Sequence, residues 1–172
     1  MTPLVERLGA ARIGATFNFY AAGARAPLLR ARLARYLDER AGASVLLVAE
    51  APGYRGARIS GIPLTSERQL TGAGPAEATA AIVHRVLGEL GLADDVLLWN
   101  VVPTHPGTAR SNRRPTRAEV DAGRPFVREL AHGRRVVAVG RVAHAALGGA
   151  YVRHPSHGGA AEFGRGLATL LA

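Results

Sequence analysis

The chain predicts a three-layer α/β/α fold, in which a central sheet of four mostly parallel strands lies between two layers of helices. Three observations predict it: short apolar runs that suit buried strands, helical patterns that alternate with these runs, and a length that suits one domain. At 172 residues the chain is too short for two ordinary domains. We therefore expect one domain over residues 1–172, with residues 1–26 as an N-terminal extension that packs on it.

Four segments have the pattern of strands in such a sheet. Three of them, SVLLVA (44–49), VLLWN (96–100) and RVVAVG (135–140), are rich in Val and Leu and are apolar on both alternations. Strands that are covered on both faces have this composition. A weaker fourth strand is predicted at YVRHP (151–155).

Helical patterns separate these strands. The first helix is predicted over 28–41, and the second over 75–91, with Pro75 near its start and Glu77 in its first turn. Further helices are predicted over residues 115–133, 142–147 and about 160–171. Because strand and helix alternate, the crossovers are expected to be right-handed and the sheet parallel.

The helix over 115–133 has a clear start and an interrupted middle. Thr116 and Glu119 have the spacing of a capping box at its N-terminus. Gly123 and Pro125 interrupt the pattern, so we expect a kink or a break into two helices there.

Polar residues follow the strands at one edge of the predicted sheet. Glu50 comes after the first strand, Asn100 ends the second, and His154 follows the fourth. In an open parallel sheet, ligands bind outside the carboxyl ends of the strands. A carboxylate, an amide and an imidazole at one rim suit recognition of a small planar polar ligand together with a hydrolytic step. Two long loops, 50–74 and 100–114, border this rim.

Each of these three residues also has a structural interpretation. Glu50 could be a solvated strand-end residue, Asn100 could hydrogen-bond a loop backbone, and His154 could be a surface imidazole. Their joint appearance at three strand ends favours a site. The histidines at 105, 154 and 157 lack the spacing of a zinc site, and no GxGxxG or Walker sequence occurs, so we expect neither a metal nor a nucleotide cofactor.

The charge of the chain favours a polyanionic partner. Its 22 basic residues, all of them arginine, stand against 13 acidic ones, and the net charge is +9. Arginine binds phosphates in bidentate fashion, and a strongly basic domain is typical of nucleic-acid binding, although a codon bias towards Arg and Ala also explains the missing lysine. With no cysteine, the chain can hold neither a disulfide nor a cysteine-ligated zinc or iron–sulfur cluster.

No targeting or membrane segment is expected. No apolar run approaches the roughly 18 residues of a membrane span. Glu6 and Arg7 lie where a signal peptide has its apolar region. We therefore expect a cytoplasmic monomer that does not bind membranes and lies on the nucleoid when it binds DNA.

Four segments, taken in order, resemble motifs of the uracil-DNA glycosylase superfamily. They are AEAPG (49–53), GARISGIPLTSE (56–67), VLLWN (96–100) and HPS (154–156). AEAPG is similar to the GEAPG motif of the family 4 branch. A bacterial branch that combines GEAPGYRG, FTSE, NRxPT and HPSxGG is also similar. The resemblance covers about residues 17–171 and implies the fold of that superfamily.

The resemblance implies a pocket that holds a base flipped out of DNA. It assigns the reading of the base edge to Asn100 and the support of the leaving base to His154. The other residues implied to bind the base are Ala51, Tyr54, Leu64, Ser66 and Glu67. The residues expected to bind DNA are Arg58, Arg113, Arg114, Arg153, Ser156 and His157.

The sequence departs from the family pattern at several positions. The four cysteines of the family 4 iron–sulfur cluster are missing. Leu64 occupies the position of the aromatic residue that stacks on uracil, which leaves Tyr54 as a candidate for stacking. His157 and Gly158 replace the apolar wedge that plugs the duplex, and this favours single-stranded or already distorted substrates.

The resemblance does not decide which carboxylate orients the water. Ala51 stands where other branches have Asp or Asn, so Glu50 and Glu67 are the available carboxylates. We favour Glu50, because it follows the first strand directly, is ionised at neutral pH and can hold and orient water. Glu67 is then expected to be a pocket wall or a charge at a helix N-terminus.

Together these features predict a monofunctional DNA glycosylase that hydrolyses the N-glycosidic bond of uracil, or of another deaminated base, without a cofactor. The alternative is a protein of the same fold that captures uracil-containing or single-stranded DNA without turnover. A small-ligand hydrolase on a similar sheet is disfavoured by the charge.

Overall fold

The central sheet has four strands, all of them parallel. The computed structural model describes residues 3–172. Its strands are β1 (Val45–Ala49), β2 (Val96–Asn100), β5 (Arg135–Val139) and β6 (Ala150–Val152). They lie in the order β2-β1-β5-β6, and each neighbouring pair is parallel. The predicted fold class and the four predicted strands are therefore confirmed.

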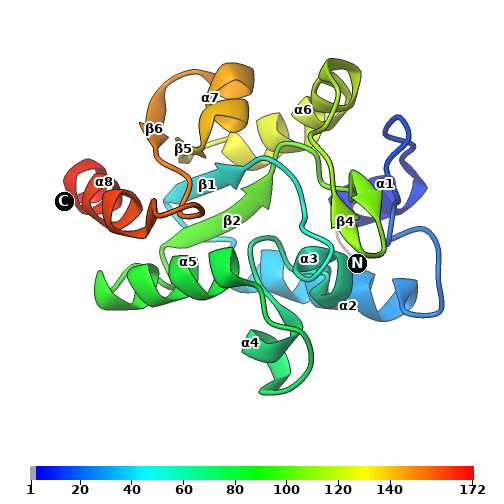
Figure 1. Ribbon diagram of the computed structural model, residues 1–172. Helices are drawn as coiled ribbons and strands as arrows, with labels where there is room; N and C mark the ends of the chain where they lie inside the picture. The colour runs from blue at the N-terminus through cyan, green and yellow to red at the C-terminus, as the bar shows by residue number, and fades with distance from the viewer. Residues whose placement is uncertain (1–2) are drawn as a thin grey trace.

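Two layers of helices cover the sheet (Figure 1). On one face, buried side chains of the strands cluster with those of α1 (Pro3–Ala10), α2 (Ala26–Glu39), α6 (Arg117–Ala131) and α7 (Arg141–Leu147). On the other face they cluster with those of α5 (Ala78–Glu89) and α8 (Ala160–Leu171). This is the predicted three-layer arrangement.

Alternation along each strand divides the core between the two layers. In β1, Leu46 and Val48 face the first cluster, while Leu47 and Ala49 face the second. Successive side chains of a strand point to opposite faces, so both alternations must be apolar in a sheet that is covered twice. The strand segments of the sequence are therefore apolar on both alternations, because both faces of the sheet are covered by helices.

The α6 helix is one continuous element, so the expected break into two helices was wrong. The capping box is present: the Glu119 amide donates to Thr116 Oγ1, and the Thr116 amide donates to the Glu119 carboxylate. Gly123 is needed for space, because a Cβ there would collide with the Val101 carbonyl oxygen. Pro125 lies on an exposed part of the helix, where water can satisfy the carbonyl that loses its N–H partner.

The α5 helix begins later than predicted. Its first residue is Ala78, and Glu77 is the N-cap residue with an extended backbone. Pro75 therefore lies in the preceding loop rather than at the helix start. The change moves the Glu77 side chain from a helix surface to the end of that loop.

Both long loops contain short regular elements. The 50–74 loop holds α3 (Ala57–Ser60) and α4 (Glu67–Thr71), and α4 projects from the body of the molecule (Figure 1). The 100–114 loop holds a small antiparallel hairpin made of β3 (Gly107–Thr108) and β4 (Ser111–Asn112). Elements this short have too few residues to show a period, and the sequence therefore indicates only loops.

The N-terminal segment is built into the core. Leu4, Val5 and Leu8 of α1 are buried in the cluster that contains α2. Further along, the backbone of Phe17 exchanges two hydrogen bonds with that of His105. Between residues 3 and 172, no helix is both long and apolar enough to cross a membrane.

Candidate functional site

A cavity of about 380 Å³ lies at the carboxyl ends of β1 and β2. We call it the rim pocket. Of the residues predicted for the site, those that line it are Glu50, Ala51, Leu64, Asn100, Arg113, His154, Ser156 and His157. The structure thus brings together the ends of three separate strands, as the topology of a parallel sheet predicts.

Glu50 is held at the mouth of this pocket by the end of β1. Its carbonyl oxygen accepts a hydrogen bond from the Val102 amide at 3.0 Å, so the backbone that carries it is fixed. Burial raises the pKa of the Glu50 carboxyl above its usual value of 4.5, and the charge of Arg114 offsets part of that rise. A partly desolvated carboxylate of this kind can bind a water molecule and accept its proton.

Asn100 forms the floor of the pocket. The residue is 1% exposed, and its Oδ1 atom is buried without a hydrogen-bond partner among residues 3–172. A buried amide oxygen without a partner is costly, and such groups are rare in folded proteins. A ligand N–H that reaches this oxygen would supply the missing hydrogen bond.

His154 is oriented by its own loop. The Ser156 amide donates to His154 Nδ1 at 3.2 Å, and the Ser156 hydroxyl lies 2.7 Å from the same nitrogen. Since an amide can only donate, Nδ1 must accept, and the proton of the neutral ring is on Nε2. Burial, and then the charge of His157, lower the pKa of His154. At neutral pH the ring is thus a neutral donor with Nε2–H free to face a ligand.

Two residues that line the pocket have a left-handed backbone without being glycine. They are Leu64 and His157, each with φ of 52°. This conformation is unfavourable for side chains other than Gly, Asn and Asp, and strain of this kind clusters at functional sites. The Nδ1 atom of His157 also lies 3.0 Å from the Ser156 hydroxyl, which extends the chain of hydrogen bonds from His154.

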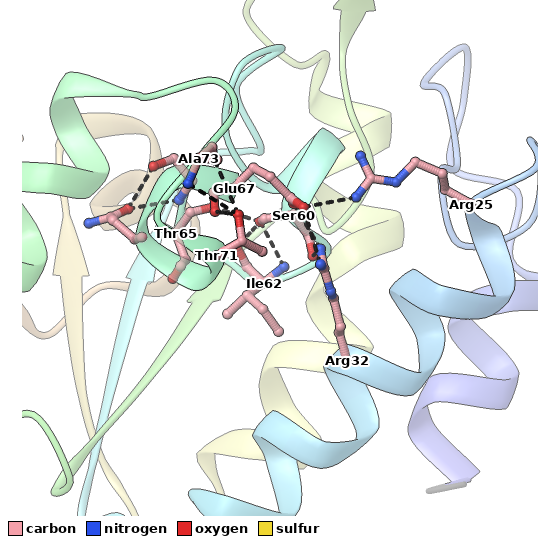
Figure 2. Close-up of polar contacts among 10 residues, drawn as sticks. Arg25, Arg32, Ser60, Ile62, Thr65, Glu67, Thr71 and Ala73 are labelled. Atoms are coloured by element: carbon pink, nitrogen blue, oxygen red, sulfur yellow. Dashed lines mark hydrogen bonds and ion pairs between the residues drawn. The ribbon is translucent and has the colours of Figure 1, made fainter.

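Glu67 lies outside the rim pocket. Figure 2 shows its carboxylate between two arginines, Arg25 at 3.1 Å and Arg32 at 2.8 Å. The hydrogen bond from Arg32 is the largest of several contributions that lower the pKa of Glu67. The carboxylate joins α4 to α2 and does not face the pocket, so its geometry suits the second of the roles expected for it, a charge at a helix N-terminus.

Ser66 and Tyr54 also lie away from the lining. Ser66 is buried as the N-cap of α4, and its amide donates to the Gln69 side chain at 2.8 Å. The amide of Tyr54 donates to Asn112 Oδ1 at 2.9 Å, and its ring does not line the pocket. No Phe, Tyr or Trp of the described chain lines it.

The arginines predicted to bind DNA have different partners in the structure. Arg113 binds the buried Glu119 through both terminal nitrogens, at 2.8 and 2.6 Å. Arg153 pairs with Glu162 at 2.7 Å, and Arg58 lies over the Phe17 ring at 5.5 Å. Arg114 remains exposed beside Glu50.

The structure adds a residue that sequence reasoning missed. Glu77, the N-cap of α5, lines the rim pocket together with Thr79, Pro106 and Asn112. Among residues 3–172 no arginine or amide offsets its burial, and burial alone raises the pKa of its carboxyl. The sequence places Glu77 in a helix turn, and only the later start of α5 turns it towards the pocket.

One imidazole joins the walls around the pocket. His105 is fully buried, and its Nδ1 lies 2.8 Å from the Pro52 carbonyl oxygen. Its Nε2 lies 2.8 Å from the Thr108 carbonyl oxygen and 3.2 Å from that of Ser111. His105 thus links the turn after β1 to the β3–β4 hairpin.

A second hollow, of about 740 Å³, opens beside the rim pocket. The two share Glu50, His154, Ser156 and His157. The second hollow adds Arg141, Tyr151, Arg153 and Glu162, so it holds two arginines, one of them paired with Glu162, and one exposed aromatic ring.

The family model of the uracil DNA glycosylase superfamily matches residues 37–168, which is most of the chain. The chain belongs to the uracil-DNA glycosylase superfamily. Membership in this superfamily confirms the resemblance inferred from the motifs, and the matched range includes AEAPG, VLLWN and HPS.

A solved structure of the superfamily has the same architecture. The crystal structure of wild-type SMUG2 from Pedobacter heparinus is similar over 99% of both chains, with a TM-score of 0.66 and 12% sequence identity. At this identity the likeness establishes the fold. No curated protein sequence matches the chain.

Proposed function

We propose that the protein is a monofunctional DNA glycosylase that hydrolyses the N-glycosidic bond of uracil, or of another deaminated base, in DNA. The observation that supports it best is the meeting of three groups in one pocket: an unpartnered Asn100 amide oxygen, a neutral His154 donor and the Glu50 carboxylate. We expect the protein to act as a monomer.

In this proposal the flipped base enters as far as Asn100. The buried Oδ1 accepts the ring N–H of the base, and the amide nitrogen donates to the neighbouring carbonyl oxygen. Cytosine lacks that N–H, so a base that arose by deamination satisfies Oδ1 and cytosine does not. The pocket then selects the base by leaving a buried polar group unpaired when the wrong base enters.

The bond breaks at the mouth of the pocket. The electron pair of the bond between the sugar C1′ and the base leaves with the base, and His154 Nε2–H stabilises the negative charge that develops on a base oxygen. Water held by Glu50 bonds to C1′ while its proton passes to the carboxylate. The departing base takes up a proton from solvent.

The second hollow offers a path for the DNA strand. Arg141 and Arg153 would contact phosphates, which position a strand without reading its sequence. Tyr151 is 40% exposed and could stack on a base next to the flipped one. With His157 and Gly158 in place of a wedge, single-stranded or distorted DNA is the favoured substrate.

The alternative function is binding without turnover. It is favoured by Leu64 in the pocket wall, because no aromatic ring of the described lining can stack on a bound base. A pocket that binds the base loosely would hold DNA without aligning the water.

Excision of uracil from a labelled strand tests both functions. The protein is incubated with single-stranded DNA that carries one uracil, and alkali then cleaves any abasic site. Strand breakage supports the glycosylase. A shifted but intact strand supports the binding protein and overturns the proposal.

A further inference from the structure

Glu77 reaches the rim pocket across the turn that follows β1. Gly53 and Gly56 are in this turn, and a Cβ on either of them would collide with the Glu77 carboxylate. For Gly53 the three nearest atoms that a Cβ would meet all belong to Glu77, and its φ is not in the left-handed region. Gly53 therefore leaves space for the carboxylate rather than allowing a special backbone conformation.

This carboxylate is unlike the paired ones in the chain. Glu67 and Glu119 each bind at least one arginine, and the pKa of each is lowered. Burial is the one cause that shifts the pKa of Glu77. Burial also raises the pKa of Glu50, where the charge of Arg114 opposes it. In a protein with 22 arginines, a half-buried carboxylate without one indicates a site that binds an external cation or dipole.

The position of Glu77 indicates which part of a ligand it meets. Asn100, on the floor, is 1% exposed, whereas Glu77, Glu50 and His154 are half-buried nearer the mouth. If a base reaches Asn100, the sugar of the same nucleotide lies at the mouth. The two carboxylates enter the pocket lining from different elements, Glu50 directly after β1 and Glu77 as the N-cap of α5.

We propose that Glu77 is a second carboxylate of the reaction, which stabilises the positive charge that develops on the sugar while Glu50 holds the water. The inference rests on the proposed function. Cleavage of a glycosidic bond produces a cationic sugar, and a carboxylate aimed at it in a partly dry site lowers the barrier.

Two strands that differ only in charge at the sugar test this role. One carries a neutral tetrahydrofuran abasic site, and the other a cationic pyrrolidine in its place. We expect the wild type to bind the pyrrolidine strand more tightly, and Glu77→Gln to reduce that preference by about tenfold or more while affinity for the tetrahydrofuran strand stays within about twofold. Equal losses on both strands, or an unchanged preference, would overturn the role.

Two further variants make the test specific. Glu89→Gln removes the same charge from the exposed end of α5, and it should keep the wild-type preference. Gly53→Ala keeps the charge but displaces the carboxylate, and it should reduce the preference as Glu77→Gln does. In a Glu77→Ala background, Gly53→Ala should have no further effect, whereas an added loss there would overturn the assignment.

The binding preference and the chemistry are measured separately. If the wild type excises no base but still prefers the cationic strand through Glu77, the proposed function and the catalytic role fail together, and Glu77 is left only as a site that binds a cationic sugar. If the wild type excises uracil without any preference for the cationic strand, the proposed function stands and the role of Glu77 fails.

Discussion

The carboxylates around the site form two chemically distinct groups. Glu67 and Glu119 are paired with arginines, which hold their pKa values low. Glu50 and Glu77 line the pocket with pKa values raised by burial. Pairing stabilises the fold, whereas an unpaired carboxylate in a cleft is poised to act on a ligand. This distinction favours Glu50 over Glu67 as the carboxylate that holds the water.

Single substitutions check this division. Glu50→Gln and His154→Ala should lose excision while the variants still shift DNA on a gel, and loss of the His154 donor should cost roughly 10²–10³ in rate. Glu67→Gln should keep most of the excision activity, because its carboxylate is bound to Arg25 and Arg32 outside the pocket. Single-turnover excision assays measure all three. An inactive Glu67→Gln beside an active Glu50→Gln would reverse the two roles.

The pH dependence of excision follows from the same residues. Glu50 acts when it is ionised, and its pKa is raised, so activity should fall with decreasing pH at values above 4.5. In the proposed mechanism His154 acts when it is neutral, and burial lowers its pKa, so it stays neutral at neutral pH. We therefore expect a plateau through neutral pH and an acid limb set by the carboxylates. A plateau that extends below pH 4.5 would contradict this assignment.

At the level of elements, the sequence predicts what depends on local pattern. The strand VLLWN matches β2 residue for residue, because an apolar run between turns needs no distant partner to be recognised. The start of α5 could not be predicted from Pro75 and Glu77, since the Glu77 side chain lies on glycines of a distant turn. The ion pairs of Glu67 could not be predicted either, because Arg25 and Arg32 are distant from it in the sequence.

One buried carboxylate ties three elements together. Glu119 of α6 binds Arg113 beside the hairpin, accepts the Thr116 amide at 2.8 Å and accepts the Ala15 amide at 3.2 Å. These contacts, led by the hydrogen bond to Arg113, hold its pKa at about 2. The segment NRRPTRAE (112–119) is thus a structural clamp as well as a basic stretch.

This clamp predicts an acid-sensitive stability. The pKa of Glu119 is lower in the folded chain than its value of 4.5 when unfolded, so its contribution is complete above pH 4.5 and is lost between pH 4.5 and 2. The contribution is about 3 kcal/mol by linkage. Glu119→Gln should lose stability of this order at pH 7 and should show a smaller drop in acid. Urea unfolding at pH 7 and pH 3 measures both.

Across the whole molecule, charge and topology act on the same face. The net charge of +9 attracts DNA from a distance, and the carboxyl ends of the strands present the rim pocket and the second hollow together. The amino ends of the strands face the other way, and α2 ends at Glu39 shortly before β1 begins there. The arginines near the rim should therefore contribute more to DNA binding than those near the opposite end.

Salt dependence measures this asymmetry. Affinity for single-stranded DNA should fall steeply with salt, and each lost phosphate contact should reduce the log–log slope by roughly 0.7. We expect Arg114→Ala and Arg141→Ala each to show such a reduction. Arg35→Ala, which changes an exposed arginine near the end of α2, is the control and should leave the slope unchanged. Equal slopes for all four proteins would contradict the assigned path.

The placement of His105 has a consequence for how the site opens. Its ring spans the Pro52 turn and the hairpin, and its backbone pairs with Phe17, so three segments from distant parts of the sequence meet at one residue. Such segments should unfold together as one cooperative unit rather than one by one. In amide hydrogen exchange, the amides of Phe17, Tyr54 and Arg113 would then share one opening rate, and a nucleotide bound in the pocket would slow all three at once.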